Sequence, residues 1–183
     1  MELWDIYGLN RQKTGKTVLK GEKLKDGEYR MVVHACIFNS HGEMLIQQRQ
    51  PFKTGWSDLW DISIGGSAIA GETSQQAVER ELREELGIDY DFSDIRPHLT
   101  VNFDTGFDDI YLIKKDISLF ELKLQTEEVQ SAKWASKNEI LKLVDGGKFI
   151  PYHDNMIELL FAMNCSYGVF NLNHPTAIKE FSK

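Results

Sequence analysis

One stretch constrains this chain more than any other: residues 65–88, with the sequence GGSAIAGETSQQAVERELREELGI. It fits the pattern G-x5-E-x7-R-E-U-x-E-E-x-G-U, in which U is aliphatic and the first glycine is Gly66. Seven positions of this pattern each require a single residue type, and a common residue matches such a position by chance about once in fifteen. Composition alone does not produce such a match, so the stretch indicates a functional element.

The same stretch predicts a glycine-rich turn that leads into a helix. Thr73 and Gln76 have the spacing of a capping box, which satisfies free backbone N–H groups at the start of a helix. Gly87 suits the left-handed residue that ends one. The helix between them is expected to bury an apolar stripe at four-residue spacing, formed by Val78, Leu82 and Leu86.

Three carboxylates share one face of this helix, because Glu81, Glu84 and Glu85 stand at positions i, i+3 and i+4. Exposed like charges at this spacing repel by about 0.2–0.5 kcal/mol per pair, so the cluster adds nothing to helix stability. A hard divalent cation such as Mg²⁺ prefers carboxylate oxygen, and its binding makes the total electrostatic energy of the cluster favourable. Most glutamate-rich helix faces are simply solvated, and the complete pattern around these residues is what favours a metal site.

At these residues the chain resembles the Nudix hydrolases, whose box it reproduces without a mismatch. The resemblance implies an α/β fold, the Nudix-type α/β/α sandwich with a mixed β-sheet. It also implies a Mg²⁺-dependent (or Mn²⁺-dependent) hydrolase acting on a small-molecule phosphoanhydride. Hydrolysis of a phosphoanhydride needs neutralised phosphate oxygens, an activated water and a diphosphate held in line.

The resemblance also implies roles for individual residues. Glu84 and Glu85 correspond to the principal metal ligands, and Glu81 to a further ligand or the general base. The carbonyl group of Gly65 or of its neighbour can complete the metal shell. Many family members use another acid from a later loop, and here Glu128, next to another glutamate, stands in that place; a solvated turn is an equal alternative.

Two pairs of residues are expected to support the reaction. Glu72 and Arg80 match the ion pair that orients the box in the family, so Arg80 is expected to fix the loop rather than touch substrate. Arg49 and Lys53 match an arginine and a lysine that bind the diphosphate in the group related to isopentenyl diphosphate isomerase. Surface charges are equally common at such places, so solvation is the alternative for this second pair.

Other residues admit both a structural and a functional interpretation. Phe103, Phe107 and Tyr111 follow the box and could stack on a base or a prenyl chain, but core packing is the favoured interpretation. His34 lies in an apolar run and is expected to be a core histidine with a hydrogen-bond partner.

Three functions are compatible with parts of this pattern. The favoured one is hydrolysis of a phosphoanhydride bond in a nucleoside diphosphate or a derivative of one. Isopentenyl diphosphate isomerase activity needs a cysteine just before the first box glycine and a histidine two residues after that cysteine, but Gly65 and Ser67 occupy these positions. A non-catalytic nucleotide-sensing module is the third alternative, although such modules commonly lose box glutamates, which are all present here.

Composition limits the partners and the location. The 183 residues are 42% hydrophobic and 27% charged, which is ordinary for a globular protein. The net charge of −7 argues against binding to nucleic acid or to an anionic membrane. The N-terminal residues resemble neither a signal peptide nor a membrane span, so a cytoplasmic protein is expected.

The rest of the chain divides into three parts. Residues 1–29 are expected to form a β-hairpin extension with solvated basic side chains, and in some relatives such a hairpin serves in a homodimer. Residues 30–166 form the Nudix domain, and residues 167–183 a tail without a clear pattern. Within the domain, strands are expected over residues 30–39, 43–49, 59–65, 95–103, 110–117, 120–124 and 131–135, with helices after Ser136 and Pro151.

Overall fold

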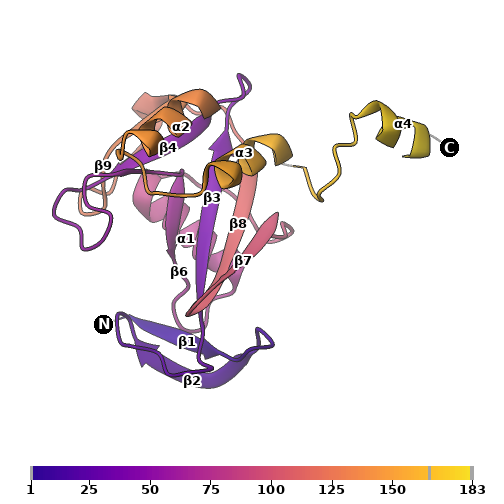
Figure 1. Ribbon diagram of the computed structural model, residues 1–183. Coiled ribbons are helices and arrows are strands. Elements are labelled where there is room, and N and C mark those ends of the chain that lie inside the picture. Colours follow the sequence, from indigo (N-terminus) through magenta and orange to yellow (C-terminus); the bar gives the residue numbers. More distant parts are fainter. Residues whose placement is uncertain (1, 165, 182–183) are drawn as a thin grey trace.

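A seven-stranded mixed sheet forms the centre of the computed structural model, which describes residues 2–164 and 166–181 (Figure 1). The central strand pairs in parallel with one neighbour over nine residues and antiparallel with the strands on its other side. This arrangement confirms the mixed sheet that was predicted. The strands are β3 (Arg30–Phe38), β4 (Met44–Arg49), β5 (Trp60–Asp61), β6 (Ile64–Ser67), β7 (Leu99–Phe103), β8 (Gly106–Lys114) and β9 (Val129–Ala135).

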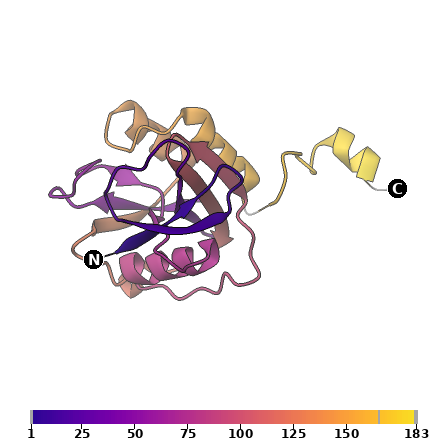
Figure 2. The same cartoon turned by 90° about the horizontal axis from the view of Figure 1, so that it is seen from below.

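Helices cover both faces of the sheet, as expected for an α/β/α sandwich (Figure 2). One face is covered by α1 (Ser74–Leu86), and the other by α2 (Lys137–Asp145) and α3 (Asp154–Met163). Alternate residues of β3 enter two separate cores: Val33 and Ala35 pack towards α1, whereas Cys36 and Phe38 pack towards α2 and α3.

The predicted helix ends are confirmed. Thr73 and Gln76 form a reciprocal capping box at the start of α1, and Gly87 ends the helix in the left-handed conformation with φ 69°. Ser136 and Glu139 make the corresponding box at the start of α2. Because a capping box depends only on residues three apart, sequence suffices to locate it.

The sheet splits open between β3 and β4, which pair with each other only at Phe38 and Met44. Residues 60–67 fill the split, where β5 pairs with β4 and β6 pairs with β3. Fully buried Ser63 lies between these short strands; its Oγ accepts from the Ile37 N–H at 2.8 Å and donates to the Leu45 carbonyl at 2.5 Å. The single strand predicted over residues 59–65 is therefore wrong, because the chain changes its pairing partner at Ser63.

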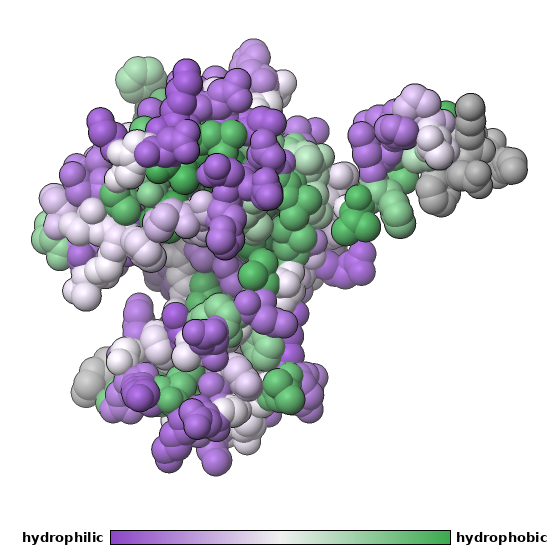
Figure 3. All heavy atoms as spheres, viewed as in Figure 1, coloured by the Kyte–Doolittle hydropathy of each residue, from purple (hydrophilic) through white to green (hydrophobic). Residues whose placement is uncertain are grey.

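The N-terminal residues form the predicted hairpin, with β1 (Leu3–Tyr7) paired antiparallel to β2 (Lys13–Leu19). Trp4, Ile6 and Tyr7 are buried. Arg11, at the hairpin turn, forms an ion pair with the fully buried Asp109 of β8. Arg11 is therefore more than a solvated edge charge, whereas Lys13, Lys16 and Lys20 are exposed, as expected. Figure 3 shows the surface indented between the hairpin and the body of the protein.

Two further segments differ from expectation. Residues 120–124, predicted as an edge strand, contain instead the end of a 3₁₀ turn, η1 (Leu119–Glu121), because Ser118 and Glu121 form a capping box that bends the chain. The tail contains a short helix, α4 (Pro175–Phe181). Among the described residues, no helix has both the length and the apolar character that a membrane span requires.

Candidate active site

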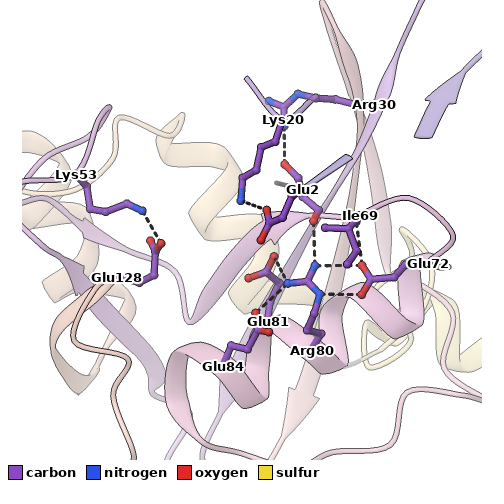
Figure 4. A network of polar contacts seen from close by, with 11 residues as sticks. Glu2, Lys20, Arg30, Lys53, Ile69, Glu72, Arg80, Glu81, Glu84 and Glu128 are labelled. Carbon is purple, nitrogen blue, oxygen red and sulfur yellow. Dashed lines mark hydrogen bonds and ion pairs between the residues drawn. The ribbon is translucent and has the colours of Figure 1, made fainter. Parts of the chain in front are cut away.

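Arg80 lies at the centre of the box and binds three carboxylates (Figure 4). Its Nε and Nη2 contact the two oxygens of Glu72 at 2.7 and 3.1 Å, so the predicted ion pair is present and bidentate. Its Nη1 lies 2.9 Å from Glu81 Oε1 and 3.0 Å from Glu84 Oε2. The pKa of Arg80 is raised, since these carboxylates outweigh the opposing effect of burial. The guanidinium therefore ties the loop before α1 to the acidic face of the helix.

The loop itself is held by hydrogen bonds from both sides. Glu72 Oε2 accepts from the backbone N–H of Ile69 at 2.9 Å, and Arg80 Nη2 donates to the Ser67 carbonyl at 3.1 Å. The hydroxyl group of Ser67 accepts from Arg30 Nη1 at 2.8 Å. Arg30 thus extends the network from the box to the opposite face of the sheet.

The N-terminal hairpin supports the same loop. The Leu3 carbonyl accepts from the Ala70 N–H at 2.7 Å, and Asp5 Oδ2 accepts from the Gly71 N–H at 2.8 Å. Glu2 and Lys20, paired at 2.6 Å, lie beside the Arg80 cluster in Figure 4. The hairpin therefore belongs to the structure that fixes the box.

Glycine is required where the box approaches the sheet. A Cβ atom added to Gly66 would lie 2.0 Å from Glu81 Oε1, and one added to Gly65 would lie 2.3 Å from the His34 ring. The Glu81 carboxylate therefore packs directly on the backbone of β6. Burial raises the pKa of Glu81, although Arg80 opposes the shift.

Glu85 of α1 is buried and meets Gln47 of β4. Gln47 Nε2 donates to Glu85 Oε2 at 2.8 Å, while Gln47 Oε1 is buried without a hydrogen-bond partner. Burial, with the neighbouring Glu81 charge adding to it, raises the pKa of Glu85 to about 8. The buried carboxylate of Glu85, the partly buried carboxylate of Glu81 and an unpaired amide oxygen form a donor set that favours an added cation.

The described residues do not contain a ready cluster of three acidic, histidine or cysteine side chains around one point. Instead Arg80 holds Glu81 and Glu84, and Gln47 holds Glu85. These oxygens are hard donors on one face of one helix, and the chemistry of the set fits Mg²⁺ or Mn²⁺ once the carboxylates turn from their present partners.

The two residues predicted to bind the diphosphate, Arg49 and Lys53, lie in different environments. Lys53 Nζ forms a 2.5 Å ion pair with Glu128 Oε1, so the structure joins a predicted phosphate ligand to a predicted metal ligand. Glu128 is also one of the charges that raise the Glu85 pKa. Arg49 instead lines a cleft on the α3 side of the sheet, and its buried Nε has no hydrogen-bond partner.

This cleft, with a volume of about 580 Å³, adjoins Gly65 and Gly66. On its floor His34 Nδ1 lies 2.7 Å from Asp108 Oδ1. Burial by itself lowers the pKa of His34, but Asp108 outweighs it, and the net shift is upward. His34 therefore has the polar partner that was expected, and it also faces the cleft.

A second polar pair lies beside the first. The Tyr152 hydroxyl donates to Asp61 Oδ1 at 2.9 Å. Burial raises the pKa of Asp61, against the effects of His34 and of this hydrogen bond. Core packing, favoured for all three aromatic residues, is confirmed for Phe107 and Tyr111, whereas Phe103 lines the cleft.

Sequence reasoning missed several residues of this region, and they share one property. Each is brought to the site by long-range pairing, and no local motif marks it: Arg30, Gln47, Asp61, Asp108 and Tyr152. The one available signal is a polar residue inside an apolar run, as with Gln47 in MLIQQR and Asp61 in LWDISI.

Comparison with known proteins places these features in context. The model of the NUDIX domain matches residues 28–158. An uncharacterized Nudix hydrolase from Listeria monocytogenes is 48% identical over 178 residues, covering 97% of this chain and 99% of the relative. A crystal structure from Deinococcus radiodurans superposes with a TM-score of 0.69 at 22% identity and covers 90% of this chain and 99% of the other. A bifunctional NMN adenylyltransferase/ADP ribose pyrophosphatase from Francisella tularensis, complexed with AMP and a manganese ion, has a TM-score of 0.56 at 25% identity, covering 72% of this chain and 41% of that one.

Proposed function

Because this chain belongs to the Nudix hydrolase family, we propose that it uses Mg²⁺ or Mn²⁺ to cleave a phosphoanhydride bond in a nucleoside diphosphate or a nucleoside diphosphate derivative. The observation that supports this most is the placement of two carboxylates next to the glycine-rich strand β6: Glu85 is buried and Glu81 is partly buried. Buried carboxylates that lie close together are costly unless a cation joins them.

The proposal assigns the metal to the acidic face of α1. Glu84 and Glu85 would be principal ligands, Glu81 a ligand or the general base, and the Gly65 carbonyl and Glu128 would complete the set. Bound there, the ion would neutralise phosphate oxygens and lower the pKa of a water molecule. Gln47 would orient Glu85 through the hydrogen bond that it already donates.

The remaining residues would position the substrate and the loop. Arg80 and Glu72 hold the loop before α1, so that the backbone of β6 stays against Glu81. Arg49, which lines the cleft, would bind one phosphate group, and Lys53 another after release from Glu128. The chain division at residues 29 and 166, the cytoplasmic location and the homodimer all stay predictions.

A panel of nucleoside diphosphates and their derivatives, assayed for phosphate or nucleotide release with Mg²⁺, tests the proposal. We expect hydrolysis by the native chain and its loss in Glu84→Gln, whereas Glu158→Gln, an exposed change on α3, should leave activity unchanged. If no member of the panel is hydrolysed, a nucleotide-sensing module becomes the better interpretation. Release that survives Glu84→Gln would contradict the metal assignment.

The isomerase alternative has its own test. Gly65 has no side chain to deliver a proton, and the His34 ring fills the space where such a side chain would stand. We therefore expect isopentenyl diphosphate to remain unchanged after prolonged incubation with protein and Mg²⁺. Formation of the dimethylallyl isomer would contradict this assignment.

A further inference from the structure

Two aspartates on the floor of the cleft are each held by one oxygen only. The hydrogen bonds that the structure describes for Asp61 both reach Oδ1, from the Tyr152 hydroxyl at 2.9 Å and the Ile62 N–H at 2.8 Å. For Asp108 the described bond is that between Oδ1 and His34 at 2.7 Å. Both residues line the cleft, and their Oδ2 atoms take part in none of these bonds.

These positions are built into the fold. Asp61 is only 4% exposed, and it lies on β5, where the chain enters the split beside Gln47. Asp108 lies on β8, in register with Val32 and next to His34, which itself packs on Gly65. Their side chains therefore hold fixed places relative to the glycine-rich strand that leads to the box.

The rim of the cleft is apolar and partly aromatic. Trp56 is 54% exposed and lines the cleft together with Phe103, Val101 and Pro151. The Arg30 guanidinium lies 5.3 Å from the centre of the Phe103 ring, which helps to hold that ring in place. Aromatic side chains around a polar floor suit a planar ring with polar edges better than a flexible hydrocarbon chain.

This inference rests on the proposed hydrolysis of a nucleoside diphosphate derivative. We infer that the cleft binds the base of that substrate, and that Asp61 and Asp108 select bases with an exocyclic amino group, of the adenine or cytosine type. The amino N–H groups would donate to the free carboxylate oxygens. A keto base places an oxygen at that position and has its donor on the adjacent ring nitrogen, so a carboxylate oxygen that faces the exocyclic position meets another acceptor.

Matched substrate pairs provide the test. ADP with IDP and CDP with UDP each differ at the base edge by an amino group in place of a keto group. Because hydrogen bonds to charged groups are strong, we expect kcat/KM to favour the amino member by about 10- to 100-fold. The assays are repeated at increasing pH, because burial raises the pKa of Asp61 and a higher pH favours its ionised form.

Asp61→Asn and Asp108→Asn should each reduce this preference, because an amide NH₂ can donate to a keto oxygen. The ratio is taken within one variant, so a uniform loss of active protein cancels. Asp89→Asn, an exposed change at an ion pair with Arg83, is the matched control and should keep the native ratio. Corresponding pairs of 2′-deoxyribose and ribose substrates show whether the sugar hydroxyl is the selected donor instead.

The inference would be overturned if the native chain did not discriminate between amino and keto bases. It would also be overturned if both aspartate variants kept the native preference, or if the preference followed the ribose hydroxyl. If neither variant folds, as judged by thermal melting, the native chain still decides through calorimetry of CMP against UMP and AMP against IMP. That binding measurement also separates the two proposals. If the chain binds amino bases selectively but hydrolyses no substrate, the proposed reaction is contradicted. If it hydrolyses substrates without selecting between bases, the proposed base site is contradicted.

Discussion

Arg80 and Glu72 form a two-point contact, with Nε to Oε1 at 2.7 Å and Nη2 to Oε2 at 3.1 Å, across the turn that precedes α1. Only a guanidinium can make this planar contact and also reach Glu81 and Glu84. The position of the box loop therefore depends on the shape of this side chain as well as on its charge.

Arg80→Lys should lower kcat for phosphoanhydride hydrolysis by about 10- to 100-fold, because lysine keeps the charge but cannot make the planar two-point contact with Glu72. Steady-state kinetics of the native chain and the variant check this. Arg83→Lys alters an exposed arginine of the same helix and should have little effect. Equal rates in Arg80→Lys and the native chain would show that charge alone suffices.

Gln47→Leu should weaken Mn²⁺ binding by about 10- to 100-fold, because Glu85 would lose the donor that orients it. Isothermal calorimetry measures the dissociation constant directly. Gln48→Leu changes the next residue of β4, whose amide binds Asp58 instead of the box, and serves as the control. An unchanged metal affinity in Gln47→Leu would remove Gln47 from the site.

Ser63→Ala should destabilise the protein by about 1–3 kcal/mol, because a buried N–H of β3 and a buried carbonyl of β4 would both lose their shared partner. Chemical denaturation gives the free energy of unfolding. Ser57→Ala, at an exposed hydroxyl, should change it little. Equal stability of Ser63→Ala and the native chain would mean that water replaces the hydroxyl in the split.

A comparison of α1 with Ser63 shows which features of the fold the sequence predicts and which it does not. The ends of α1 were predictable because the capping residues act locally, as with Thr73 and Gln76 three positions apart. The carboxylate face was predictable because the three glutamates lie within four residues of one another. The change of strand partner at Ser63 was not predictable, because its hydroxyl bonds to backbone groups of two strands that lie 18 and 26 positions earlier in the chain.

The same distinction applies to the candidate site. The Glu72–Arg80 pair was predictable from a motif with fixed spacing, whereas Asp61 meets Tyr152 across 91 positions and His34 meets Asp108 across 74. Such contacts depend on the order of strands and on the placement of α3, which local propensity does not determine. The acidic face of α1 could therefore be predicted from sequence, but the floor of the cleft could not.

His34 should titrate above its ordinary pKa of 6.5, because the contact with Asp108 outweighs the cost of burying an imidazolium. A folded pKa above the unfolded value means that the folded state binds the proton more tightly. The resulting stability is fully present below about pH 6.5 and is lost as the pH rises through the folded pKa. Asp108→Asn should lower the His34 pKa, because the ring would lose its main stabilising partner while the effect of burial remains. NMR titration of the imidazole measures the His34 pKa in the native chain and in the variant. A His34 pKa that is the same in the variant and in the native chain would show that Asp108 does not hold the charge on this ring.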